Sequence, residues 1–204
     1  RLKKQTSGKK EKLVKREMVQ VMSKGTCISA TETDSVPKVL LALRCRKNVI
    51  SVAFLEVGAN IITVGSFTDD ENYTMFKTFI SQVRPVEVVY EAIETHPTVL
   101  RIIRNCSTNP VLSPLNDPMA WNVMKAYADL EANYGSKDKW PEGLGEVLKM
   151  DESLKDQVML SISGLIVYLK KMLIADTVLH AARFDFYDPN KFQISRMVLD
   201  SQAL

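Results

Sequence analysis

Three acidic residues are placed where the metal site of a nuclease would need them. Glu56 and Glu91 each end an apolar run, and Asp117 stands where a helix is expected to begin. Metal-dependent nucleases hold paired divalent ions with converging carboxylates, so that the metals activate water and stabilise the leaving oxygen. Acidic residues at strand ends are also common on solvated surfaces. We therefore expect surface acids here, and an active metal-dependent nuclease is kept as an alternative function.

A basic segment at the start of the chain could contact nucleic acid. Residues 1–24 contain nine Lys or Arg residues against two Glu residues, whereas the net charge of the whole chain is only +3. Runs of like charge are more often solvated helix faces than phosphate-binding surfaces. The candidate DNA contacts are Lys9, Lys10, Lys12, Lys15 and Arg16. A stand-alone basic DNA-binding module is therefore the second alternative function.

Other catalytic and cofactor motifs are not found in the sequence. It has no Gly-x-x-x-x-Gly-Lys-[Ser/Thr] loop for nucleotide phosphates and no Gly-x-Ser-x-Gly elbow for a nucleophile. The cysteines and histidines are too few and too widely spaced to predict a zinc site. These residues are Cys27, Cys45, Cys106, His96 and His180. The sequence predicts no catalytic, cofactor-binding or metal-binding residues, and no ATP hydrolysis by this segment itself.

The composition predicts one medium-sized folded domain with overhangs. The 204 residues are 46% hydrophobic and 25% charged, close to the averages of folded proteins. The first residue is Arg1 and not Met, so we expect a fragment of a longer protein. No apolar stretch approaches the roughly 20 residues that a membrane span requires. Three scattered thiols are typical of a reducing compartment, either the cytoplasm or the nucleus.

Hydrophobic periodicity predicts the elements that must position these residues. A basic amphipathic helix over residues 7–24 ends before Gly25, and residues 31–37 form a polar linker. Three strands separated by short polar connections indicate antiparallel hairpins. Two helix-strand units follow them, which gives the order β-β-β-α-β-α-β. The expected strands are residues 39–45, 49–56, 61–67, 86–90 and 110–112, and the two helices begin after Asp70 and at Pro97.

This order predicts an α/β fold with an RNase H-like mixed sheet, flanked by long helices. A further helix is expected from Asp117 to about Tyr134, and residues 135–141 are expected to be a loop. One long helix is predicted from about Asp151 to His180. At a rise of 1.5 Å per residue it would be about 45 Å long, too long for a small compact domain. We therefore expect it to bridge two domains.

Several stretches match one known family in order and in spacing. Residues 15–19 with the Lys-Gly-Thr turn at 24–26 resemble the end of the mismatch-binding domain of MutS-type DNA mismatch-repair proteins. The chain is most similar to the eukaryotic sixth-homologue branch of that family, and the most specific match is the helix at residues 160–171. The other matching stretches are residues 52–56, 64–70, 84–91, 143–148 and 196–200. The loops at residues 31–37 and 105–114 depart from the family pattern, so the resemblance specifies the family more closely than the subunit.

The resemblance implies three segments and a mechanical role. Residues 1–30 would close the mismatch-binding domain, residues 31–135 would form the connector, and residues 136–204 would be a linker and the first long helix of the lever domain. The segment is expected to be non-catalytic and without a cofactor. It would couple the binding of mismatched double-stranded DNA to the ATPase and clamp of the full-length protein.

The resemblance also implies partners and a location for the full-length protein. That protein would bind ATP and Mg²⁺, pair with a second MutS homologue as a heterodimer and signal to a MutL homologue, for which the connector is a docking candidate. It would act in the nucleus, with no membrane partner. MutS proteins wedge the Phe of a Phe-x-Glu motif beside a mispair, but Phe54-Leu55-Glu56 lies inside an apolar strand and is expected to be core. Trp121 and Trp140 are likewise expected to be packing residues.

Overall fold

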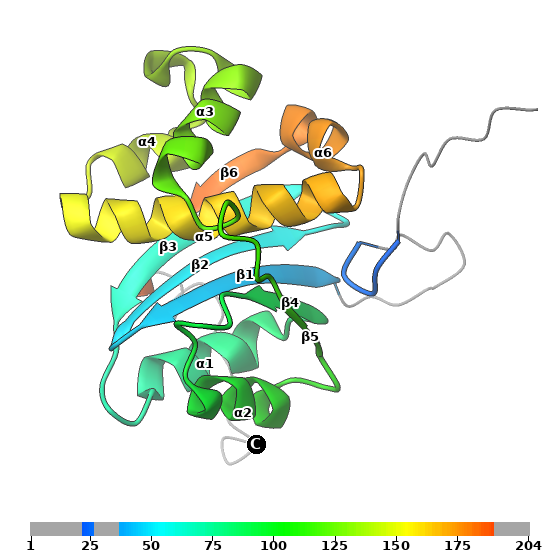
Figure 1. The fold of residues 1–204 in the computed structure, drawn as a ribbon, viewed down its shortest axis with the longest axis vertical. Helices are drawn as coiled ribbons and strands as arrows, with labels where there is room; N and C mark the ends of the chain where they lie inside the picture. Colours follow the sequence, from blue (N-terminus) through cyan, green and yellow to red (C-terminus); the bar gives the residue numbers. More distant parts are fainter. Residues whose placement is uncertain (1–21, 27–36, 190–204) are drawn as a thin grey trace, which may run out of the picture.

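A computed structural model describes residues 22–26 and 37–189 and contains one six-stranded mixed sheet (Figure 1). The strand order is β5-β4-β1-β2-β3-β6, with β1, β2 and β3 antiparallel and with β4 and β5 parallel to β1. This arrangement confirms the predicted RNase H-like fold. The strands are β1 (Val39–Arg46), β2 (Val49–Glu56), β3 (Ile61–Thr68), β4 (Glu87–Tyr90), β5 (Val111–Pro114) and β6 (Arg183–Phe186).

Helices cover both faces of the sheet. Helices α1 and α2 lie on one face, whereas α5 crosses the other face with α3, α4 and α6 around it (Figure 1). The helices are α1 (Thr74–Val83), α2 (Pro97–Cys106), α3 (Val123–Tyr134), α4 (Glu142–Leu148), α5 (Glu152–Lys171) and α6 (Ala175–Ala181), and Lys137–Lys139 form one turn of 3-10 helix.

The central strands are mostly apolar because both of their faces are buried. In β1, Leu40 and Ala42 face the core beneath α5, whereas Leu41 and Leu43 face the core beneath α1 and α2. The hairpin between β1 and β2 has a tight turn at Lys47 and Asn48, in which Lys47 adopts a left-handed φ of 54°. The predicted hairpins and the predicted order of the first seven elements are thus confirmed.

The single long helix predicted to end at His180 is wrong. Helix α5 ends at Lys171, Leu173 takes a left-handed φ of 59°, and a separate helix α6 starts at Ala175. No Gly or Pro marks this break in the sequence. The amide of Ile174 instead closes the helix end by donating to the carbonyl of Leu169.

The expectation that this helix bridges two domains is also wrong for the described part of the chain. The side chains of Val158, Ile162, Leu165 and Leu169 are buried in one core with residues of β1, β2 and β3. Helix α5 therefore forms one layer of the domain that contains the sheet.

Other boundaries differ from the sequence analysis. Helix α3 begins at Val123 and not at Asp117, while α4 and β6 were not predicted. Strand β6 has four residues and joins the edge of the sheet beside β3, too short a segment for periodicity to reveal. Within the described residues no helix is long and apolar enough to cross a membrane. The predicted helix at 7–24 lies largely outside the described residues, and the stretch at 196–200 that matches the family lies wholly outside them.

Candidate functional site

Of the three acidic residues proposed for a nuclease, Glu91 and Asp117 line one pocket, but Glu56 does not join them. In the sheet register Glu56 pairs with Val39 at the start of β1, whereas Glu91 follows Tyr90, which pairs with Leu43. Along β1, five residues separate the position of Glu56 from that of Glu91, which is about 17 Å at 3.3 Å per residue. No group of three or more potential ligands that could hold a metal ion occurs in the described ranges. The nuclease alternative thus loses the geometry on which it depended.

A different acid, Glu87, is the most deeply buried carboxylate of the described chain. Its side chain is only 1% exposed at the start of β4, facing α5. One oxygen accepts hydrogen bonds from Ser23 Oγ at 2.6 Å and from the backbone N–H of Gly25 at 2.8 Å. The other accepts from Tyr168 Oη and from Ser113 Oγ at 3.3 Å. We call Glu87 with these four donors the Glu87 joint.

The Glu87 joint connects three parts of the chain that are distant in sequence. Ser23 and Gly25 belong to the described segment 22–26, Ser113 lies in β5 and Tyr168 lies in α5. A buried carboxylate is tolerated only when donors replace its lost hydration. The four donors do so here, with none from Lys or Arg within the described residues. Removing any one donor therefore weakens the attachment of segment 22–26 to the sheet.

The Lys-Gly-Thr turn fits this joint closely. A Cβ atom on Gly25 would lie 2.8 Å from both Cβ and Oε2 of Glu87, so only glycine permits the approach. Lys24 Nζ donates to the carbonyl of Asn109 at 2.8 Å, and Ser23 N donates to Thr26 Oγ1 at 2.9 Å. The turn is therefore held by the sheet and by its own side chains.

The hydrogen bond from the hydroxyl of Tyr168 to Glu87 is expected to be sensitive to high pH. Burial first, and then the hydrogen bond to Glu87, raise the pKa of Tyr168 to about 12. The unfolded tyrosine loses its proton near pH 10, so the stabilisation is complete below about pH 10 and is lost between about pH 10 and 12. We expect Tyr168→Phe to be less stable than wild type at neutral pH by about 1 to 2 kcal/mol, and this gap to shrink above pH 10.

Urea unfolding of both proteins across this pH range checks the prediction. Tyr134 has a pKa that burial alone raises to about 12, and it is present in both proteins, so its contribution cancels in the difference. A gap that stays constant from neutral to strongly alkaline pH would contradict the assignment.

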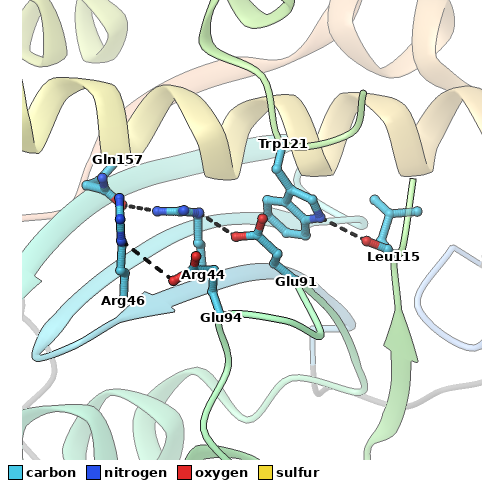
Figure 2. Close-up of polar contacts among 7 residues, drawn as sticks. All are labelled: Arg44, Arg46, Glu91, Glu94, Leu115, Trp121 and Gln157. Atoms are coloured by element: carbon cyan, nitrogen blue, oxygen red, sulfur yellow. Dashed lines mark hydrogen bonds and ion pairs between the residues drawn. The ribbon is translucent and has the colours of Figure 1, made fainter. Parts of the chain in front are cut away.

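A second polar cluster fixes the opposite end of α5 (Figure 2). Arg44 of β1 is buried, and its Nε lies 2.5 Å from Oε2 of Glu91, which follows β4. The guanidinium also donates to Oε1 of Gln157 on α5. Helix α5 is therefore held on the sheet by polar contacts near both ends, at Gln157 and at Tyr168. Glu91 is a half-buried partner in an ion pair with the buried Arg44, and not the surface acid that the sequence predicted.

The Arg44–Glu91 pair is expected to matter more than the neighbouring Arg46–Glu94 pair. Arg44 and Glu91 side chains are 7% and 20% exposed, whereas those of Arg46 and Glu94 are 58% and 32% exposed at a separation of 3.6 Å. Glu91→Gln should lower the free energy of unfolding by about 2 kcal/mol because it leaves a buried charge unpaired. Glu94→Gln should change it by less than about 0.5 kcal/mol. Equal effects of the two variants in urea unfolding would contradict this assignment.

A pocket lies beside Glu91, beyond the carboxyl ends of β4 and β5. It has a volume of about 290 Å³ and is lined by Glu91, Ala92, Ile93, Leu115, Asn116, Asp117, Pro118 and Trp121. The Trp121 indole donates to the carbonyl of Leu115 at 2.9 Å (Figure 2). A Cβ atom on Gly164 of α5 would lie 2.5 Å from the indole, so the ring is packed firmly on that helix. The pocket wall is therefore preformed.

The other predicted residues have mixed outcomes. Phe54 is 1% exposed and packs on Phe79, which confirms that the Phe-x-Glu motif is core. Trp140 is buried, with its indole N–H on the carbonyl of Gly135, and is a packing residue as predicted. Lys9, Lys10, Lys12, Lys15 and Arg16, the candidate DNA contacts, lie outside the described residues.

The sequence analysis missed the two residues at the centre of the polar clusters. Glu87 and Arg44 each stand inside an apolar run that was predicted to be a buried strand. A charged residue at such a position requires a partner, and that requirement is the signal that was available.

A match to a known family covers strands β1 to β5 and helices α1 to α6, but not the edge strand β6. Residues 38–181 match the family model described as MutS domain II. The DNA mismatch repair protein Msh6 of Homo sapiens is 26% identical over 211 aligned positions, which cover 89% of this chain and 15% of that protein. The Arabidopsis thaliana protein of that name is 26% identical over 238 positions, covering 97% of this chain and 18% of that protein. The chain thus spans less than a fifth of the length of these relatives.

Proposed function

This chain belongs to the MutS domain II family, and from that membership we propose that it serves DNA mismatch repair as the connector of a MutS-type protein. Its role is mechanical and non-catalytic. It couples the part of the protein that binds mismatched double-stranded DNA to the part that binds ATP and Mg²⁺ and clamps the DNA. Relatives named as DNA mismatch repair proteins support the general role.

The Glu87 joint is the observation that best supports coupling. A connector transmits a rotation only if its attachments at both ends are stiff and the attached parts have discrete states. Ser23 and Gly25 are held to the sheet through a carboxylate that also holds Tyr168 of α5. A movement of segment 22–26 therefore acts directly on the sheet and on its covering helix.

The test is to loosen the joint in the complete protein without unfolding it. We expect the double variant Ser113→Ala/Tyr168→Phe to bind mismatched DNA within about twofold of wild type, while mismatch-stimulated ATP turnover falls by about tenfold. The matched control is Ser81→Ala/Tyr127→Phe, which removes the same atoms from half-buried or exposed positions of α1 and α3. Unchanged stimulation in the first variant, or an equal loss in the control, would reject coupling through the joint.

The partners and location of the complete protein are part of this proposal. They are a second MutS homologue in a heterodimer, a MutL homologue that docks on the connector, and the nucleus. Mixing this chain with the N-terminal domain of a MutL homologue tests the docking by calorimetry. Binding supports recruitment by this segment, and its absence leaves a purely mechanical connector.

The basic residues Lys9, Lys10, Lys12, Lys15 and Arg16 are proposed as phosphate contacts that strengthen DNA binding without selecting mispairs. If they act so, the affinity of the chain for duplex DNA falls steeply with salt. Replacing Lys9, Lys10 and Lys12 with Gln should then make the fall of log K with log salt less steep, by about 2 to 3 in the slope. An unchanged slope would mean that these residues form a solvated helix face.

A further inference from the structure

The position of the pocket beside Glu91 is one at which open α/β sheets bind ligands. From β1 the chain passes to β2 and β3 on one side of the sheet, and then returns to β4 and β5 on the other. The carboxyl ends of β1 and β4 therefore flank a switch in strand order, and crevices at such switches are the usual binding sites of these sheets. The residues after β4 and after β5 line the pocket, from Glu91 to Ile93 and from Leu115 to Pro118.

The lining of the pocket favours a cation. It contains the carboxylates of Glu91 and Asp117 and the indole of Trp121, and no Lys, Arg or His. The buried Arg44 balances the charge of Glu91 from behind, so the charge of Asp117 is the one that makes the pocket acidic. Arg44 uses Oε2 of Glu91, and the backbone N–H of Met119 uses Oδ1 of Asp117. Within the described residues Oε1 of Glu91 and Oδ2 of Asp117 accept no hydrogen bond. Two carboxylate oxygens beside an aromatic ring suit a guanidinium, which bonds to the oxygens and stacks on the ring.

Exposed apolar side chains border this polar centre. Ile93 lines the pocket and is 93% exposed, and Met119, which follows Pro118, is 54% exposed. Large apolar side chains at the edge of a pocket are available for contact with another protein surface. A volume of about 290 Å³ is at the lower limit for a small-molecule site. It suits one side chain of a partner, and its acidic lining disfavours nucleic acid, whose phosphates it repels.

We propose that this pocket receives an arginine side chain of a partner protein, with Ile93 and Met119 in contact with the apolar residues that flank that arginine. Arginine is favoured over lysine because its planar fork can stack on Trp121 while bonding to the carboxylates. The proposal rests on the pocket alone, so it stands or falls separately from coupling through the Glu87 joint.

The two tryptophans make the proposal directly testable. The probe is the peptide acetyl-Leu-Arg-Leu-amide, titrated into the ¹⁵N-labelled chain while the indole N–H signals are followed by NMR. Trp121 lies in the pocket, whereas Trp140 packs away from it on Tyr127. We expect a saturable shift of the Trp121 signal with the Trp140 signal unchanged. Equal shifts of both signals, or none, would overturn the proposal.

The contribution of the pocket's negative charge is tested by two matched substitutions in the protein. Asp117→Asn keeps an acceptor for the Met119 amide but removes the charge, and it should weaken the peptide by about tenfold. Asp138→Asn removes an equal charge from an exposed position outside the pocket and should leave binding unchanged. An equal effect of these variants would reduce the interaction to general charge attraction and overturn the site.

Changes in the probe separate the features of the proposed partner. Replacing its arginine with neutral citrulline should abolish the Trp121 shift, and replacing it with lysine should weaken binding by about fivefold. Removing both leucines, or the substitution Ile93→Ser, should weaken binding by about threefold or more. Equal binding of the lysine peptide would overturn the preference for arginine. Insensitivity to the leucines and to Ile93 would overturn the flanking apolar contacts.

Discussion

Replacing Glu87 with alanine is expected to lower the free energy of unfolding by about 4 kcal/mol, the largest effect of any single polar substitution considered for this domain. The reason is that four donors lose the carboxylate that they share, in a place that water reaches poorly. The buried Tyr168 and the half-buried Ser113 would lose their acceptor, and Ser23 and the Gly25 amide would no longer be bound to the sheet. Urea unfolding measures the loss.

Hydrogen exchange gives this variant a local readout. The Gly25 amide donates to Glu87 Oε2 at 2.8 Å, so its exchange should accelerate in Glu87→Ala even where the domain remains folded. Glu131→Ala, at an exposed position of α3, removes the same side chain and should cost less than about 0.5 kcal/mol. If the two variants unfold alike and Gly25 exchange is unchanged, the Glu87 joint does not exist as described.

Two glycines of the same helix should respond to alanine in opposite directions. A Cβ atom on Gly143 of α4 would lie 2.4 Å from the backbone oxygen of Phe184 in β6, and backbone in a paired strand cannot easily move away. Gly143→Ala should therefore lower the free energy of unfolding by about 2 to 3 kcal/mol. A Cβ atom on Gly145 would meet no other atom within 4 Å, so Gly145→Ala should raise it by about 0.5 to 1 kcal/mol.

The glycine pair also tests where the domain ends. Helix α4 packs on β6, β6 pairs with β3, and β3 belongs to the central antiparallel sheet. If residues 142–186 fold with that sheet, Gly143→Ala lowers the midpoint of the single unfolding transition. If Gly143→Ala instead affects only a small transition that precedes the main one, residues 142–186 unfold as a separate unit. A domain boundary at residue 135 predicts that second result. Calorimetry distinguishes the two results.

Much of the sheet could be predicted from the sequence because its signals are local. The apolar runs of β1, β2 and β3 arise because both faces of these strands are buried, and the short connections between them favour hairpins. The change to helical periodicity after Asp70 marks the first crossover in the same way. The order of the first five strands along the chain and the antiparallel pairing of the first three followed from these patterns.

The end of α5 could not be predicted for a physical reason. Residues 172–174 carry no Gly or Pro, and their apolar side chains continue the helical pattern into α6. The helix stops because Leu173 adopts a left-handed conformation and the backbone closes on Leu169. Leu173 itself is 48% exposed, so the steric cost of this conformation is offset by the burial of its neighbours Leu169 and Ala175 in the core.

The sequence by itself determined the order of the first five strands along the chain, the apolar runs that form the core, and the absence of recognisable nucleotide-binding and catalytic motifs. Only the tertiary structure decided which charged residues of the strands meet, because their partners are far away along the chain. Glu87 accepts hydrogen bonds from the Gly25 amide and from Tyr168, which are separated from it by 62 and 81 residues in the sequence. Arg44 donates to Gln157, at a separation of 113 residues. The hydrophobic periodicity of a segment shows only which of its faces is buried. Contacts over such separations exist only after the sheet and α5 have packed, so local patterns carry no record of them.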